Sequence, residues 1–398
     1  MNPYQRSVAP VAYGTDEAAA AMQAGPFTVR RCGGADRGAV LRAAGRAADR
    51  SAAGVRAGGR AMSPTTEHPV TAGAVRDRVH DVGAAHAFLT LPGFRPRFST
   101  TLKLEALNAA GSIKLKTARE MLTAAGDEGL LRPGNALIES TSGNLGIALA
   151  TICAAEGHRL TLVTDPNTPA QSIRHMRALG AEVVVVRDRD ANGGYLGTRI
   201  ALIEERLRIT PGLVWLNQYR NPANSLAHSR HTMTEILDGF GEPDWLFVGV
   251  GSSGTFMGCL RAIRERGLAT TLVAVDAIGS VTFGSEPATR HLPGLGASRR
   301  PELFVDDGSF TKIRICERQT VRTCRQVART YGLLPGASTG TALSAVAALD
   351  EHIPTGSRVL VVAPDLGERY LDTLYDDEWV ARTLGDDALT DLPDAPHR

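Results

Sequence analysis

The sequence lacks a charge excess of either sign, despite its length. Its 398 residues carry 44 basic and 42 acidic side chains, which gives a formal net charge of +2. So small a net charge provides no overall field for nucleic acid or for an anionic membrane surface. The longest apolar runs, such as residues 145–155, are also too short to span a bilayer. We therefore expect small-molecule ligands, no nucleic-acid partner and no membrane partner.

Cysteine is scarce as well. The five cysteines are scattered, form no C-x-x-C pair and show no metal-ligand spacing. The N-terminus lacks the basic-then-apolar order of a secretory signal. These absences fit reduced thiols in the cytoplasm and predict no metal site.

The chain is longer than one core normally supports, so we expect two domains between two tails. Residues 1–67 are rich in Ala, Gly and Arg and have few large apolar side chains, which predicts a disordered leader. Two alternatives remain open for it: a basic contact arm over residues 30–60, or a true start at Met62. Residues 386–398 form an acidic, proline-containing tail that we expect to be frayed.

Strand patterns and helix patterns alternate between these tails. We expect strands at residues 100–107, 135–139, 160–164, 182–186, 271–276 and 358–363, and helices at residues 117–125, 145–156, 171–179, 195–207, 228–238 and 320–331. Valines at helical steps in residues 68–96 suggest an amphipathic start, and residues 336–342 read as a small-residue loop. The alternation predicts an α/β fold with parallel sheets and right-handed crossovers.

Four polar features fall at strand-to-helix turns, where open α/β sheets bind ligands. They are Lys114, the turn 140–144, the glycine-rich loop 251–255 and Ser338. A lysine can carry covalent chemistry when it is partly desolvated, and a glycine-rich loop before a helix suits a phosphate. Together with an amide and a hydroxyl, these groups are what pyridoxal phosphate needs. Taken singly, each has a plain reading, a solvated cation for Lys114 and a structural turn for the loop.

Five motifs in order from about residue 70 to 385 resemble the cysteine synthase family. They are N-A-A-G-S-I-K (108–114), T-S-G-N-L-G-I-A (141–148), G-V-G-S-S-G-T (249–255), L-P-G-L-G-A (292–297) and P-D-L-G-E-R-Y-L (364–371). The family comprises fold type II pyridoxal-phosphate enzymes related to the tryptophan synthase β subunit. Further segments, such as W-L-N-Q-Y (215–219), look more like its branch in 2,3-diaminopropionate biosynthesis, which serves siderophore and peptide-antibiotic pathways.

The resemblance implies two domains, each with a mostly parallel sheet flanked by helices, and a homodimer. The smaller domain would span residues 100–220, and the larger, cofactor-binding domain would combine residues 68–99 with 221–385. The implied reaction is a β-elimination followed by a β-addition that joins O-phospho-L-serine to L-glutamate. Its products would be N-(1-amino-1-carboxy-2-ethyl)-L-glutamate and phosphate.

The resemblance also assigns roles by position. Lys114 would bind the cofactor covalently and move the Cα proton of the substrate. The other implied cofactor-binding residues are Asn144, Gly251, Ser252, Ser253, Gly254, Thr255 and Ser338. The implied substrate-binding residues are Thr141, Ser142, Gly143, Gln218, Tyr219 and Arg199. For Arg199, a solvated cation on the surface of its helix is an equally open reading.

The chain departs from the family pattern in three places. Leu115 and Lys116 replace the usual Asp-Arg after the lysine, which predicts the loss of a buried charge pair. Residues 83–88 replace an early Gly-Asn/Gln-Thr-Pro turn, and Gly251 stands where the diaminopropionate branch prefers a hydroxyl. These departures leave two rivals: a cysteine or S-sulfocysteine synthase that uses sulfide or thiosulfate, and a non-catalytic paralogue.

Overall fold

The computed structural model describes residues 27–28, 76, 78–132 and 134–390, and they build two sheets. The larger sheet has seven strands in the order β1-β10-β9-β8-β11-β3-β2, and only β2 runs antiparallel to its neighbour. Their bounds, in that order, are Phe27–Thr28, Thr311–Ile315, Thr271–Ala277, Trp245–Gly249, Arg358–Ala363, Ser99–Leu104 and Phe88–Thr90. The central strands are buried runs of β-branched and aromatic residues, as expected for a parallel sheet covered on both faces.

The smaller sheet has four parallel strands in the order β6-β5-β4-β7. Their bounds are Glu182–Val185, Arg159–Thr164, Ala136–Ser140 and Leu213–Trp215. The expected α/β fold class, with two mostly parallel sheets, is confirmed.

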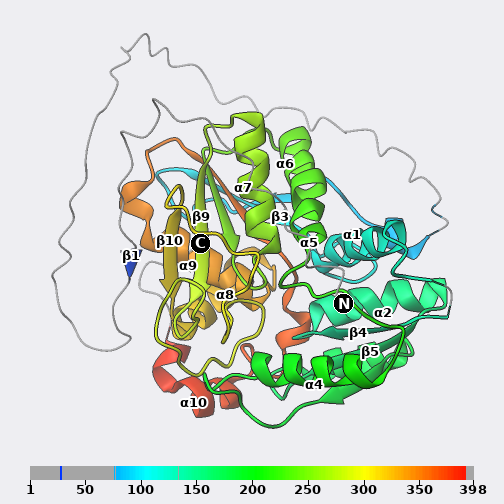
Figure 1. Ribbon diagram of the computed structural model, residues 1–398. Helices are drawn as coiled ribbons and strands as arrows, with labels where there is room; N and C mark the ends of the chain where they lie inside the picture. Colours follow the sequence, from blue (N-terminus) through cyan, green and yellow to red (C-terminus); the bar gives the residue numbers. More distant parts are fainter. Residues whose placement is uncertain (1–26, 29–75, 77, 133, 391–398) are drawn as a thin grey trace, which may run out of the picture.

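Helices cover both faces of each sheet (Figure 1). Around the smaller sheet lie α1 (Lys114–Asp127), α2 (Asn144–Glu156), α3 (Ala170–Ala178) and α4 (Leu196–Ile209). One face of the larger sheet packs against α6 (Met233–Gly239) and α7 (Gly254–Arg266), and the other against α8 (Glu317–Tyr331) and α9 (Ala337–Ala348).

Shorter helices complete the fold. They are η2 (Val79–Asp81), α5 (Pro222–Ala227), a π-helical turn η3 (His228–Thr232), η4 (Asp350–His352), η5 (Gly367–Tyr370), α10 (Asp377–Leu384) and η6 (Asp386–Leu389). No helix in the described part of the chain is long and apolar enough to cross a membrane.

The division between the two units differs from the expected one at its start. We placed residues 100–107 in the smaller domain, but β3 pairs with β11 inside the larger sheet. The chain passes to the smaller unit only at α1, whose buried face packs against α2. Lys114 therefore stands where the chain leaves one unit and enters the other.

Two other expectations at the start of the chain need correction or lie beyond the described residues. Among the described residues of the segment 68–96, only the short elements η2 and β2 are regular, so the amphipathic pattern there does not produce a long helix. Within the expected leader, Phe27–Thr28 pairs with β10, while the rest of residues 1–75 lies outside the description. The same holds for residues 391–398 of the expected tail.

The segment 336–342 was expected to be a loop, but Ala337 begins α9. This helix is buried along nearly its whole length between the larger sheet and α8. Small residues permit that burial, because a side chain on Gly340 would collide with Cys324 of α8. The Thr341 and Ser344 hydroxyls donate to carbonyls four residues earlier, so tertiary packing overrides the weak helix propensity of the S-T-G-T run at the start of α9.

Candidate active site

Lys114 occupies the first position of α1, directly after the small-residue turn. Its Nζ lies 3.2 Å from Ser252 Oγ and 3.4 Å from Gln218 Oε1. Burial lowers the pKa of this amine to about 8, against the opposing effect of the nearby Glu139 carboxylate. Lys114 can therefore lose its proton near neutral pH, as a nucleophilic amine must.

Glu139 is a functional candidate that the sequence reading missed. It lies fully buried near the end of β4, where Oε1 accepts the Ser140 N–H at 2.9 Å and the Trp215 Nε1–H at 3.2 Å. Burial raises the pKa of this carboxyl to about 7. One carboxylate in an otherwise apolar strand pattern, L-I-E, was the available clue. Glu139 and Lys114 thus titrate in overlapping pH ranges and affect each other's charge.

The turn 140–144 is shaped by its own hydroxyl and by a distant partner. Thr141 Oγ accepts the N–H groups of Gly143 and Gly146 at 3.0 and 2.9 Å, which closes the turn at the start of α2. Gly143 has a φ of 131°, which L side chains rarely adopt. Gln218 Nε2 donates to the Ser140 carbonyl at 2.8 Å. Because the other end of the Gln218 amide contacts Lys114, this hydrogen bond links the turn to the lysine.

Asn144 is fixed at both ends of its amide. Its Nδ2 donates to Asp365 Oδ2 at 2.7 Å, and its Oδ1 accepts from Arg369. Asp365 is also held by the Tyr370 hydroxyl at 2.6 Å. These partners follow β11 in the larger unit, so Asn144 is positioned by contacts across the two units.

The glycine-rich loop between β8 and α7 has the shape of an anion cradle. Ser253 adopts a left-handed φ of 72° just before α7, and its buried Oγ has no hydrogen-bond partner among the described residues. A Cβ on Gly251 would lie 2.9 Å from the Gly294 carbonyl oxygen, and one on Gly254 would collide with Asn224. The loop therefore presents backbone N–H groups and an unused hydroxyl at a helix N-terminus, which fits a phosphate group.

Two cavities meet at Lys114. The smaller, of about 70 Å³, is lined by Asn144 and Ser338 as well as by the turn 141–143. The larger, of about 130 Å³, contains Gly251 and Ser252 and continues past Tyr219 to Arg199. Lys114, Gln218 and Ser142 line both cavities. Most of the expected site residues, although they come from distant parts of the chain, thus line the two cavities at Lys114.

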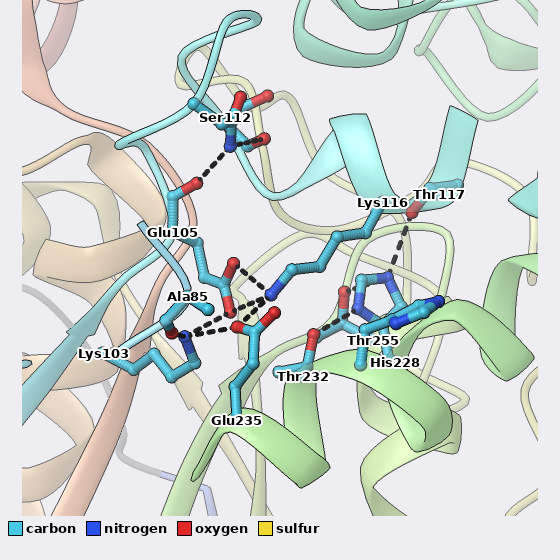
Figure 2. A network of polar contacts seen from close by, with 12 residues as sticks. Ala85, Lys103, Glu105, Ser112, Lys116, Thr117, His228, Thr232, Glu235 and Thr255 are labelled. Atoms are coloured by element: carbon cyan, nitrogen blue, oxygen red, sulfur yellow. Dashed lines mark hydrogen bonds and ion pairs between the residues drawn. The ribbon is translucent and has the colours of Figure 1, made fainter. Parts of the chain in front are cut away.

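Ser253, Gly254 and Thr255 line neither of these two cavities. Thr255 Oγ lies 3.2 Å from Nε2 of His228, which also lies 3.0 Å from Thr117 Oγ (Figure 2). Burial keeps the pKa of His228 well below its usual value, so the imidazole is neutral. His228 therefore connects the helix that carries Lys114 to the helix that follows the glycine-rich loop, and the sequence reading missed it.

Arg199 is not a solvated cation. Its side chain is buried, with 6% of the residue exposed, and its Nε lies 3.4 Å from Asp165 Oδ2. Tyr219 is also buried, and burial raises the pKa of its hydroxyl. Both residues therefore form part of the wall of the larger cavity.

Lys116 keeps a buried charge beside Lys114, which corrects the expected loss of ion pairing. Its Nζ lies 2.8 Å from Glu105 Oε2 and 2.5 Å from Glu235 Oε2. Lys103, which is fully buried, contacts the same two carboxylates at 3.2 and 2.7 Å (Figure 2). We call these four residues the buried charge cluster. None of its four residues lines either of the two cavities, and Leu115 is buried among the apolar residues of α1 and α2.

The described residues contain no group of His, Cys, Asp and Glu side chains that could hold a metal ion. The three free cysteines among them, Cys153, Cys259 and Cys324, are buried. Burial raises the pKa of each thiol to about 12, so none of the three is a ready nucleophile. None of these three thiols lines the two cavities, whereas the Lys114 amine lines both.

Comparison with known proteins gives a consistent result. A family model described as "Pyridoxal-phosphate dependent enzyme" matches residues 87–365. Curated relatives include the N-(2-amino-2-carboxyethyl)-L-glutamate synthase of Ralstonia nicotianae, 42% identical over 281 residues that cover 70% of this chain and 83% of the relative. The enzyme of the same name from Cupriavidus metallidurans is 40% identical over 298 residues, 74% of this chain and 87% of the relative.

Similar solved structures include an O-ureido-L-serine synthase, with 28% identity and a TM-score of 0.70 over 77% of this chain and 100% of the other. The O-acetylserine dependent cystathionine beta-synthase of Helicobacter pylori has 27% identity and a TM-score of 0.69. That match covers 76% of this chain and 99% of the Helicobacter chain.

Proposed function

Because this chain belongs to the family of pyridoxal-phosphate dependent enzymes, and within it to the cysteine synthase-like β-replacement enzymes, we propose a specific reaction for it. The enzyme joins O-phospho-L-serine to L-glutamate and forms N-(1-amino-1-carboxy-2-ethyl)-L-glutamate and phosphate. The Cβ–O bond to phosphate breaks, a bond from Cβ to the glutamate nitrogen forms, and the glutamate amine loses one proton. The identity of about 40% to two synthases named for this product supports the assignment.

The residues present fit the cofactor. We propose that Lys114 binds it covalently, that Asn144 donates to its ring oxygen and that Ser338 faces its ring nitrogen. The backbone of residues 251–255 would hold its phosphate, a role supported by the unused Ser253 hydroxyl and by the start of α7. When bound, the cofactor would supply an electron sink for bonds broken at the substrate Cα.

The observation that carries the proposal is the position of Lys114, an easily deprotonated amine between two cavities. Once displaced by the substrate amine, Lys114 would take the Cα proton. The exposed Ser142 and the neighbouring backbone of the turn 140–144 would hold the carboxylate of phosphoserine, with Gln218 beside them. The buried Arg199 would face the anionic end of a substrate in the larger cavity, with Tyr219 next to it.

Gly251 favours one second candidate, a cysteine or S-sulfocysteine synthase. Its Cβ position lies against the Gly294 carbonyl, so the wall there is main chain and offers no side-chain hydroxyl. A small sulfur nucleophile would need no such contact. This candidate uses the same cofactor, the same lysine and the same first half of the reaction, and differs only in the acceptor.

The deciding experiment incubates purified, cofactor-loaded protein with O-phosphoserine and with L-glutamate, sulfide or thiosulfate in turn. Product mass identifies the acceptor, and released phosphate counts turnovers. We expect the glutamate adduct and one phosphate per adduct. Formation of cysteine or S-sulfocysteine alone would reject the glutamate assignment.

Lys114→Ala is the matched test of the cofactor role. The wild type should show the visible absorbance band of a lysine-bound cofactor, and the variant should lose that band while remaining folded by circular dichroism. Lys312→Ala is the control, because that lysine lies on β10 in an ion pair with Asp306, outside both cavities. A colourless wild type after addition of pyridoxal phosphate would contradict the enzyme reading.

A further inference from the structure

The larger cavity is rich in positive charge. Its lining includes Lys114, Arg189, Arg199 and Arg290, whereas Asp165 is the only carboxylate among the described residues that line it. Arg290 belongs to the segment between β9 and β10, and none of the sequence motifs assigned it a role. An excess of cations in a partly enclosed space favours an anionic ligand.

Two of these guanidinium groups have donors that the protein does not use. Arg199 Nε and Nη1 and Arg290 Nε are buried, and none has a hydrogen-bond partner among the described residues. The contact of Arg199 with Asp165 is an ion pair at 3.4 Å and not a hydrogen bond. Buried charged donors are costly to leave unsatisfied, so these N–H groups call for a ligand with several acceptor oxygens.

The position of Arg290 is fixed by contacts that leave its Nε unused. Its Nη1 donates to the Leu295 carbonyl at 2.8 Å, and Asn167 Nδ2 donates to the Arg290 carbonyl at 3.4 Å. Burial raises the pKa of Asp276 to about 6 and also raises the pKa of Glu317, and the nearby Arg290 charge opposes both shifts. Within the described part of the chain, neither carboxylate accepts a hydrogen bond from Arg290. The guanidinium is thus oriented before any ligand arrives.

The two arginines come from different units. Arg199 lies in α4 beside the smaller sheet, and Arg290 lies in the larger unit, so an anion held by both would bridge the cavity. The planar guanidinium fork suits a carboxylate or a phosphate. The smaller cavity, with Ser142 and Asn144, already offers a separate place for the phosphoserine carboxylate, which leaves this end for another group.

We propose that Arg290, together with Arg199, binds a carboxylate of the acceptor amino acid. The inference rests on the proposed function, because sulfide has no carboxylate to bind. Glutamate brings two carboxylates into the site, and its amine must reach the substrate Cβ next to Lys114 while its other end extends toward the arginines. The leaving phosphate presents similar anionic oxygens, so the experiment separates the two sources.

The test uses Arg290→Met, which removes the charge and keeps the bulk, and Arg290→Lys, which keeps the charge and loses the fork. Arg299→Met is the matched control, because Arg299 is an exposed neighbour that pairs with Glu302 on the surface. Two quantities are measured: the KM for glutamate in complete turnover, and the absorbance change that O-phosphoserine alone produces in the cofactor-loaded enzyme.

Loss of a charge-assisted hydrogen bond predicts a rise in the glutamate KM of roughly tenfold or more in Arg290→Met. Arg290→Lys should lie between this variant and the wild type, and Arg299→Met should match the wild type. The half-saturation concentration for phosphoserine alone should not change. A rise in that concentration, with or without a change in the glutamate KM, would assign Arg290 to the phosphate and overturn the proposal.

An unchanged glutamate KM in a folded Arg290→Met enzyme would also overturn the proposal and leave Arg290 with only its Leu295 contact. If Arg290→Met does not fold, the comparison of Arg290→Lys with the wild type decides by the same two measurements. Failure of the proposed function is distinguishable, because the wild type would then give no glutamate adduct at all.

Discussion

Replacement of Glu139 by Gln should make Lys114 easier to deprotonate. Glu139 is isosteric with Gln, and the Ser140 N–H and Trp215 Nε1–H can both still donate to a side-chain oxygen. The substitution therefore removes a charge with little change in packing. Burial has lowered the pKa of Lys114 to about 8, and the Glu139 carboxylate opposes that shift. Without the carboxylate, the pKa of Lys114 should fall further.

The size of the effect depends on how fully Glu139 is charged. An opposite charge a few ångströms away shifts a pKa by roughly 1–3 units. Glu139 and Lys114 form no direct ion pair in the described structure, and the pKa of Glu139 is itself raised to about 7, so the carboxylate is partly protonated near neutral pH. We therefore expect the lower end of that range, a decrease of about one unit, which is about 1.4 kcal/mol of charge interaction.

The assay exploits the low lysine content of the chain, which has only Lys103, Lys114, Lys116 and Lys312. Cofactor-free protein is treated with an amine-selective acylating reagent over a range of pH, and the Lys114 peptide is quantified by mass spectrometry. Its labelling should rise through a midpoint near pH 8 in the wild type and about one unit lower in Glu139→Gln. Lys312 serves as the internal reference. An unchanged or higher midpoint would refute the electrostatic coupling.

Two further predictions concern the neighbours of the site. Lys116→Met leaves the two carboxylates of the buried charge cluster with one cation fewer. This variant should lower the free energy of unfolding by roughly 2–3 kcal/mol in urea titrations. The exposed control Arg261→Met should change the free energy of unfolding by less than about 0.5 kcal/mol. Gly251→Ser forces a side chain against the Gly294 carbonyl, which costs a strain of about 1–2 kcal/mol. Cofactor affinity measured by fluorescence titration should therefore fall roughly tenfold. An unchanged affinity would show that the loop moves to accommodate the side chain.

The features that the sequence predicted well are those written in local patterns. Alternating strand and helix periods located β3, β4, β5, β6, β9 and β11 but not β7 or β10, and the small-residue turn before Lys114 was visible without the fold. The prediction of a loop at residues 336–342 was wrong because the start of α9 is determined by tertiary packing and not by a local pattern. The Ser, Thr and Gly residues of its first turn have a weak helix preference and become helical because the sheet and α8 enclose them.

Contacts between distant residues could not be predicted from the pattern. Lys116 finds Glu235 across 119 positions, and Asn144 finds Arg369 across 225. A departure from the family pattern at residue 116 therefore suggested a lost charge pair, although its two partners lie directly after β3 and in α6. Glu139 was missed because a single polar residue in an apolar segment has no periodicity to distinguish it, and His228 was missed because it is one of five consecutive polar residues at 228–232.

The contact between Gly251 and the Gly294 carbonyl has a consequence for the divergence of the site. A wall made of side chains can change shape through rotamers or through a single substitution, whereas a wall made of two backbones can change only if a loop moves. New acceptor substrates are therefore more easily accommodated near Arg199 and Arg290 in the larger cavity, where a single substitution changes both the charge and the length of a side chain. At the Gly251 end, the cavity can change shape only if the backbone of one of the two loops adopts a different conformation.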